Sequence, residues 1–409
     1  MQYRRYNKIL GIKGGESMQP IQEKERIVTL DIIRGFAIFG ILLVNMLAFF
    51  SPFIYINPNE YWSHPTDVWA LNFIDIFAQA SFYTLFSFLF GYGFIIFTSR
   101  LQEKGLSVGK YFTRRLVVLL LIGCIHAFLI WHGDILIIYA LIGFLLIPFL
   151  RVSVKGLTWT AILILVIPNG LLALSYFIAV KLGMGYEFFD ELKPMVDQSI
   201  EVYKNGTFLE VTAQRIHDWS FVNISNFIFL IFTLLPMFLF GAAAAKIKLV
   251  EKAEEHLPLL KRLWLVTLIG TLVFKLLPYY TEKNLFTEIV QDFFGGPFHA
   301  IFYFTTITLL VKMNIAYSFL KPLRHIGRMS LSNYLLQSVV CTFIAYGYGL
   351  GYYDDLSVSF RIFLAIILFS TQILLSKWWL SRFQYGPAEW LWRVGTYGSR
   401  QSFKKVQKG

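Results

Sequence analysis

Long apolar runs constrain the fold of this chain most. Runs of about 18 or more apolar residues recur along its 409 residues, and each can cross a hydrocarbon layer of about 30 Å as a helix. The chain is 56% hydrophobic and only 15% charged, whereas roughly a quarter of an average soluble chain is charged. These features predict an all-α fold: a polytopic integral membrane bundle of about ten transmembrane helices.

Ten spans are predicted, and they divide the chain into three parts. The spans lie near residues 32–50, 70–98, 112–131, 134–150, 157–181, 219–245, 259–278, 295–313, 330–349 and 358–381. The three parts are a basic cytoplasmic segment (1–26), the transmembrane bundle (27–385), and an interfacial amphipathic segment with a basic tail (386–409). Because "KGGES" before Met18 can be encoded by a purine-rich ribosome-binding sequence, we hypothesise that native translation starts at Met18 and excludes residues 1–17.

The charges of the loops alternate along the chain. "RLQEKGLSVGKYFTRR" carries five Lys and Arg residues, whereas "SPFIYINPNEYWSHPTDVW" and "WHGD" carry none. The positive-inside rule therefore predicts a multi-pass protein of the bacterial cytoplasmic membrane with both termini in the cytoplasm. This clustering accounts for most of the net charge of +12, so the lipid bilayer is the expected partner and nucleic acid is not.

The cysteines and the sequence motifs indicate no disulfide and no metal site. Cys124 and Cys341 both lie inside apolar runs, where they are expected to be small buried hydrophobes. The sequence contains no zinc-type HExxH, CxxC pair, Walker A loop or GxSxG elbow. Functional candidates are therefore sought among ionisable residues within spans, which are costly there and commonly functional.

The first candidates lie in "LDIIRGFAIFGILLVNM". Asp31 and Arg34 are three residues apart on one helix face, and Asn45 lies about three turns further along that face. One interpretation is an ion pair that caps the span; the other is a functional arginine at the cytoplasmic entrance.

The second candidates flank the short "WHGDIL" segment. Arg114 and Arg115 mark the cytoplasmic end of the preceding span, and His126 lies well inside it, where it can serve as a general base. His132 is in the loop and is expected to be solvated. Asp134 begins the next span and can cap its helix, a role compatible with a catalytic one.

The third candidates lie in "RHIGRMSLSNYLLQS" and "YGPAEWLWR". Arg324 and Arg328 are expected at the cytoplasmic edge, and a polar series that must face protein or a water-filled cavity follows them: Asn333, Tyr334, Gln337 and Ser338. In "YGPAEWLWR", Glu389 and Arg393 have the spacing of a helical ion pair, which is typical of an interfacial amphipathic helix.

These motifs resemble the bacterial YeiB-like family, domain of unknown function 418. The resemblance rests on "LDIIRGFAIFGILLVNM", "RRLVVLLLIGCIHAFLIWHGDILIIYALIG", "GRMSLSNYLLQS" and "YGPAEWLWR", in that order over nearly the whole chain. The family is distantly similar to transmembrane acyltransferases of the acyltransferase-3 and heparan glucosaminide acetyltransferase types. In acyltransferase-3 enzymes an RG motif opens the first helix and a His follows it; here Arg34 matches, and Asn45 occupies the region of the His.

The resemblance implies a membrane-embedded acyltransferase that moves an acyl group from cytosolic acyl-CoA, the only cofactor expected, to an envelope glycan or lipid. The CoA phosphates are assigned to arginines: Arg34, Arg114, Arg115, Arg324 and Arg328. The catalytic candidates are His126, Asp134 and His132, and the substrate-binding candidates are Asn45, Asn333, Tyr334 and Gln337. The alternatives are an exporter of a small metabolite or lipid-linked intermediate and a non-catalytic scaffold, and an oligomer is left open.

Overall fold

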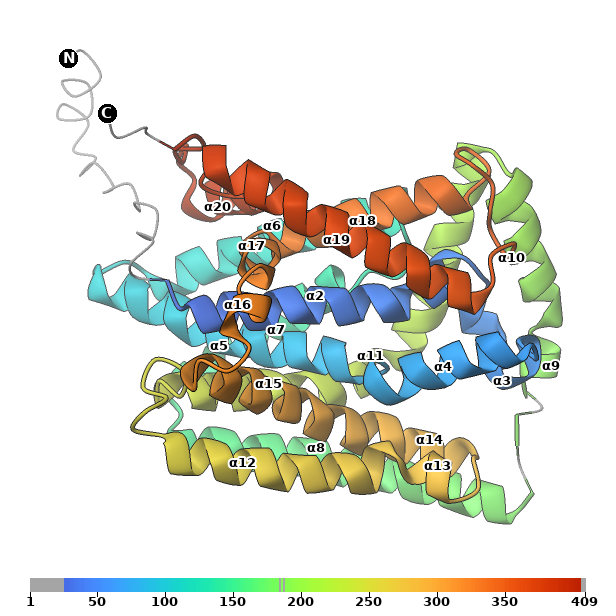
Figure 1. The fold of residues 1–409 in the computed structure, drawn as a ribbon, viewed down its shortest axis with the longest axis horizontal. Helices are drawn as coiled ribbons and strands as arrows, with labels where there is room; N and C mark the ends of the chain where they lie inside the picture. Colours follow the sequence, from blue (N-terminus) through green and yellow to red (C-terminus); the bar gives the residue numbers. More distant parts are fainter. Residues whose placement is uncertain (1–25, 184, 187, 406–409) are drawn as a thin grey trace.

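The computed structural model describes residues 26–183, 185–186 and 188–405. The described residues form helices joined by short turns and no β-strand, apart from one isolated bridge between Phe383 and Lys404 (Figure 1). The predicted all-α polytopic bundle is therefore confirmed. The hypothesised start at Met18 lies outside the described residues.

Within the described residues, eight stretches of helix are long and apolar enough to cross a membrane. They are α2 (Val28–Phe49), α4 (Pro65–Phe77) with α5 (Ser81–Glu103), α6 (Val108–Leu129), α8 (Val154–Lys181), α11 (Phe208–Lys246), α12 (Leu257–Gly270) with η4 (Thr271–Lys275), α14 (Leu285–Val290) with η5 (Gln291–Gly295) and α15 (Gly296–Lys312), and α19 (Val358–Arg382). Several of them expose apolar side chains such as Leu171 and Leu374, which suit contact with lipid. The chain is a multi-pass membrane protein.

Two of the ten predicted spans are shorter than expected. The span at 330–349 is α18 (Ser330–Ala345), and the span at 134–150 is the nine-residue α7 (Leu136–Phe144) followed by the 3-10 helix η3 (Ile147–Arg151). At 1.5 Å per residue, α7 is only about 14 Å long. It returns along α6, because Gly123 of α6 faces Ile137 and Gly143 of α7 faces Leu116. Apolar composition alone did not show that this helix ends early.

The bundle has two different ends. We call the end where α2 begins and α20 (Pro387–Tyr397) lies the terminal end, and the opposite end, where α10 (Lys193–Asn205) lies, the distal end (Figure 1). The 39 residues of α11 span about 58 Å, well beyond a hydrocarbon layer of about 30 Å. The polar start of α11 therefore stands outside the hydrocarbon, and with α10 it covers the distal end. Tyr203 of α10 is fully buried, so α10 packs against the bundle.

The centre of the bundle is a close crossing of α5 and α11. A Cβ atom on Gly91 would lie 1.8 Å from the carbonyl oxygen of Phe238, and one on Gly241 would lie 1.9 Å from that of Phe88. Neither distance leaves room for a side chain, so the two backbones touch directly. Small residues allow such approach between membrane helices, where van der Waals packing replaces the hydrophobic effect.

Candidate active site

The "WHGDIL" segment contributes Asp134 to a buried pair with His126, which we call the inner pair. The Nδ1 atom of His126 lies 2.7 Å from Oδ2 of Asp134, and its Nε2 lies 2.8 Å from the hydroxyl oxygen of Ser338. All three side chains are buried. The contacts join α6, the turn after it and α18, so both ring nitrogens of His126 are occupied.

The turn between α6 and α7 holds Asp134 in two roles at once. Its second oxygen, Oδ1, accepts a hydrogen bond of 2.8 Å from the backbone N–H of Ile137 in the first turn of α7. The Tyr334 hydroxyl donates to the carbonyl of Gly133 (3.2 Å), and its ring lies 4.9 Å from the imidazole of His126. The capping contact predicted for Asp134 is therefore present beside its contact with His126.

The second pair is His132 with Asp218, which we call the outer pair. The Nδ1 atom of His132 lies 3.2 Å from the Tyr203 hydroxyl and 3.7 Å from Oδ2 of Asp218. Asp218 also accepts hydrogen bonds from Tyr203 (2.7 Å), Tyr55 (2.6 Å) and Gln214 (2.7 Å). Within the described part of the chain no hydrogen bond occupies Nε2 of His132, so this nitrogen is left for a substrate.

The expectation that His132 is solvated is wrong. The side chain is only 5% exposed, because Tyr203 of α10 and the start of α11 cover it. This burial lowers the pKa of His132, and the negative charge of Asp218 partly offsets the effect. His132 is therefore a neutral imidazole at pH 7, the form that can accept a proton.

Three adjoining cavities lie in a row between the two ends of the bundle. The terminal cavity and the middle cavity share Phe86, Phe90, Ser330 and Trp392. The middle cavity and the distal cavity share Val44, Asn45, Gly133 and Ile135. The distal cavity is lined by His132 and Asp134, one member of each pair. We call this row of adjoining cavities the path; it extends from the terminal end to both pairs.

The terminal cavity is cationic. Five arginines line it against two carboxylates, Asp31 and Glu389; the arginines are Arg26, Arg34, Arg115, Arg328 and Arg393. The predicted Asp31–Arg34 contact is present at 3.0 Å, and Arg115 lies over the ring of Trp392 at 3.6 Å from its centroid. The excess of positive charge suits an anionic ligand such as a phosphate, which arginine can bind in a bidentate manner.

Comparison with known proteins identifies the family. The chain is 37% identical to "Uncharacterized protein YxaH" of Bacillus subtilis, in an alignment that covers 96% of this chain and 99% of that protein. It is 31% identical to "Uncharacterized protein YeiB" of Escherichia coli, with 90% and 96% covered. Residues 244–399 match the family described as "Protein of unknown function (DUF418)". The chain belongs to this YeiB-like family. The predicted family resemblance is confirmed, and the distant likeness to acyltransferases stays a prediction.

The motifs of this YeiB-like chain occupy different parts of the path. Arg34 faces the terminal cavity, Asn45 lies where the middle and distal cavities meet, and Tyr334 lines the middle cavity. Arg115 and Arg328 also line the terminal cavity. The predicted common face of Arg34 and Asn45 is confirmed, because both face the same path.

Other predicted residues face away from the path. Arg114 donates to the carbonyl of Gly395 (3.1 Å), and Arg324 lines none of the three cavities. Asn333 donates to Ser376 (3.0 Å), and Gln337 donates to Gln372 of α19 (2.9 Å). Asn333 and Gln337 therefore join α18 to α19, and neither lines any of the three cavities of the path.

The C-terminal motif closes the terminal cavity. Glu389 of α20 accepts hydrogen bonds from the backbone N–H groups of Leu331 (2.7 Å) and Ser332 (3.1 Å), at the start of α18. No ion pair joins Glu389 to Arg393 in the described structure, so that predicted pair is wrong: Glu389 caps the unpaired N–H groups of another helix instead. Trp392 donates to the carbonyl of Arg115 (2.8 Å), which fixes α20 against α6.

Sequence reasoning missed the partners of the outer pair. Asp218, Tyr203 and Tyr55 come from three separate segments, and Ser338 was noted only as one polar position of α18. The available signal was the polar stretch "QRIHDW" directly before an apolar run, which indicates a helix that continues beyond the membrane. Among residues 26–183, 185–186 and 188–405, no group of three His, Cys, Asp or Glu residues is arranged to hold a metal ion.

Proposed function

We propose that this protein transfers an acyl group from cytosolic acyl-CoA to an extracytoplasmic acceptor. The observation that carries the proposal is the path of three cavities, which begins among arginines and ends at a neutral, buried histidine. The two ends of such a path supply different chemistry: charge for the donor at one end, and a base for the acceptor at the other.

The terminal cavity is assigned to the phosphates of CoA. Arg34, Arg115 and Arg328 line it from α2, α6 and the segment before α18, so they surround a ligand from several sides. Hydrogen bonds to a charged group contribute about 1.5–3 kcal/mol each. The carboxylate of Asp31 holds Arg34 in place.

The middle cavity is assigned to the pantetheine arm and the acyl group. Its volume is about 190 Å³, and its walls are mostly apolar side chains such as Ile38, Phe82 and Phe90. Ligand sites with such walls typically bind largely apolar groups. The middle cavity adjoins both others, so an arm anchored by its phosphates in the terminal cavity can extend through it toward the distal cavity.

The distal cavity is assigned to the chemical step, with His132 as the base. Its free Nε2 takes the proton of an acceptor hydroxyl or amine, whose oxygen or nitrogen then attacks the thioester carbonyl. The carbon–sulfur bond breaks as the new bond forms, and the CoA thiolate takes the proton back from His132. The Asn45 amide, which has no hydrogen bond within the described protein, is placed to donate to the developing oxyanion.

The inner pair is assigned a positioning role. Sequence reasoning favoured His126 as the base, but both of its ring nitrogens are bonded within the protein. We therefore assign to His126 the task of holding Asp134 and the turn that carries His132. Asp134 itself lines the distal cavity and can contact the acceptor.

The orientation of the protein belongs to the proposal. From the alternating loop charges we assign the terminal end to the cytoplasm and the distal end to the outside. A cysteine in place of Asn59, at the distal end, should react with an impermeant thiol reagent added to whole cells, and one in place of Lys104 should not. Both positions are exposed. The reverse labelling pattern would contradict every assignment of sides above.

The test of the proposal uses the full chain in lipid nanodiscs. CoA and acetyl-CoA should both raise the unfolding temperature, and radiolabelled acetyl-CoA should pass its label to an acceptor in an envelope extract. Arg34→Ala should reduce the stabilisation by CoA. Absence of any response to either ligand, together with absence of transfer, would refute the donor assignment.

An exporter is the second candidate, because a row of adjoining cavities across the bundle can also pass a solute. The apolar walls of the middle cavity disfavour a polar metabolite on this route, but not a lipid-linked intermediate. Export from vesicles without consumption of acyl-CoA would favour this function over acyl transfer.

A further inference from the structure

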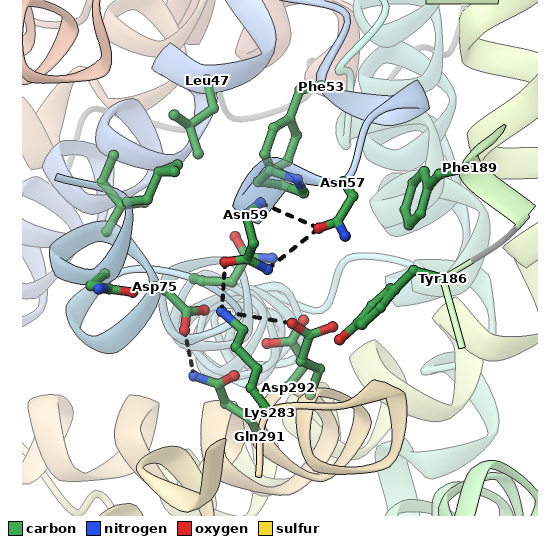
Figure 2. A pocket seen from close by; sticks show the side chains of 16 residues that line it. Leu47, Phe53, Asn57, Asn59, Asp75, Tyr186, Phe189, Lys283, Gln291 and Asp292 are labelled. Carbon is green, nitrogen blue, oxygen red and sulfur yellow. Dashed lines mark hydrogen bonds and ion pairs between the residues drawn. The ribbon is translucent and has the colours of Figure 1, made fainter. Parts of the chain in front are cut away.

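A fourth cavity, which we call the side pocket, opens at the distal end and belongs to none of the sites above (Figure 2). It lies between the turn after α2, helix α4, and the α14–η5 segment. In Figure 2 the rings of Tyr186 and Phe189 stand on one side of it, and Asp75 and Gln291 stand on the other.

The lining of the side pocket is rich in amide and carboxylate groups. Five amide side chains contribute both donors and acceptors: Asn57, Asn59, Asn72, Gln79 and Gln291. Three carboxylates accept hydrogen bonds: Asp75, Glu288 and Asp292. A ligand that donates and accepts many hydrogen bonds fits this lining, and the rings of Tyr186 and Phe189 offer apolar faces beside them.

The charges of the side pocket are nearly balanced. Lys283 lies 3.7 Å from Glu288 and donates to Asn59 (3.1 Å), and the buried Lys275 lies 4.0 Å from Asp292. Among the described residues no arginine lines the side pocket, in contrast to the terminal cavity. A phosphate would meet three carboxylates, and an alkyl chain would leave the amides unpaired, so neither ligand suits these walls.

A π-helical segment, η5, supplies Gln291 and Asp292 to the wall of the side pocket, and a second one, η4, supports it from behind. Segments η4 and η5 lie side by side, because a Cβ atom on Gly295 would lie 2.7 Å from the backbone of Lys275. Lys275 donates to the carbonyl of Gln79 (3.0 Å), and Gln291 donates to Asp75 (2.8 Å). π-Helical turns are rare and occur frequently at functional sites; here they set the positions of the polar groups of the pocket.

The side pocket adjoins the distal cavity. Both cavities are lined by Phe53 and Gln79. A ligand in the side pocket can therefore extend past these two residues toward His132 and Asp134.

We infer that the side pocket binds a polyhydroxylated sugar, whose hydroxyl groups match the mixed donors and acceptors of its walls. The inference rests on the proposed function in one respect: the sugar is the acceptor whose hydroxyl reaches the distal cavity. The binding of the sugar itself does not depend on acyl transfer and is measured separately.

The experiment measures equilibrium binding of tritiated D-glucose, N-acetyl-D-glucosamine and glycerol to the full chain. Lipid nanodiscs are used because glucoside detergents carry sugar headgroups that would compete. We expect at least one sugar to bind saturably, and we expect Asp75→Ala and Asn72→Ala each to weaken that binding at least tenfold. The matched control is Asn226→Ala, an exposed amide on α11 that lines none of the four cavities. Affinity for acetyl-CoA should stay unchanged in all three variants.

Four outcomes separate the two claims. Saturable sugar binding that Asp75→Ala and Asn72→Ala weaken, without acyl transfer, supports the side pocket and counts against the proposed function. Acetyl-CoA turnover with no sugar binding overturns the side pocket alone. Saturable binding of inorganic phosphate or decanoate in place of the sugars overturns the sugar assignment, as does sugar binding that both Asp75→Ala and Asn72→Ala leave unchanged.

Discussion

The inner and outer pairs use the same two residue types and differ in access. In the inner pair, His126 bonds to Asp134 on one side and to Ser338 on the other, and it touches none of the three cavities of the path. In the outer pair, His132 faces Asp218 through one nitrogen, and its side chain lines the distal cavity. The difference shows that a buried histidine with a carboxylate partner is not by itself a base; it also needs a nitrogen that a substrate can reach.

The largest effect of a substitution on acyl transfer is expected at the outer pair. Replacing His132 by Ala removes the proposed base, so acyl transfer should fall by roughly 10²–10⁴-fold, the contribution typical of a general base. Donor affinity and the unfolding temperature should change little. Transfer is measured with radiolabelled acetyl-CoA, and the control is His64→Ala, an exposed histidine outside the cavities. Full activity of His132→Ala would remove the functional difference between the pairs.

Substitutions in the inner pair should lower the free energy of unfolding. Replacing His126 by Ala leaves the buried carboxylate of Asp134 without its partner, a change that typically costs about 3–5 kcal/mol. Asp134→Asn keeps an acceptor for the N–H of Ile137 and should cost less. Denaturant unfolding in detergent measures both free energies. A stable His126→Ala protein that has lost transfer would exchange the roles of the two pairs.

Substitutions in the terminal cavity should change only the affinity of the protein for the acyl donor. Arg34→Ala should weaken CoA binding by about 1.5–3 kcal/mol, and Arg34→Lys should recover only part of this, because a point charge does not replace the planar guanidinium. Calorimetric titration with CoA measures the change, and the exposed Lys104→Ala is the control. If Arg34 only pairs with Asp31, expression or thermal stability will fall while CoA affinity of the surviving protein stays normal.

The smallest effect is expected in the dependence of the transfer rate on pH. Burial lowers the pKa of His132 below its ordinary value of 6.5, so the neutral base is already populated at neutral pH. The transfer rate should rise with pH and level off below about pH 6.5, the unperturbed value. Asp134→Asn should keep this profile. A midpoint above 6.5 would contradict the assignment of His132 as a base in this environment.

Much of the fold followed from the sequence, because apolar runs report directly on membrane passage. The exception at residues 134–150 shows the limit of that signal. Leu, Ile and Phe continue through Pro148 into η3, so hydropathy stays high where the helix has already ended.

The site was predictable only within single helices. Spacing placed Arg34 and Asn45 on one face, and it placed His126 deep in α6. Spacing could not predict that Ser338, 212 positions away, contacts Nε2 of His126. It also could not predict that Tyr203 of α10 covers His132. The partners of a buried polar group are chosen by tertiary packing, which local periodicity does not encode.

The direct backbone contact of α5 and α11 at Gly91 and Gly241 has a consequence for motion. A protein that opens alternately to two sides must roll or slide its halves past each other. At this crossing a small rotation would press a carbonyl oxygen into the neighbouring main chain. The two helices therefore move as one rigid unit. Any gate along the path must be formed by smaller parts that move relative to this unit, such as the ring of Tyr334 or helix α10.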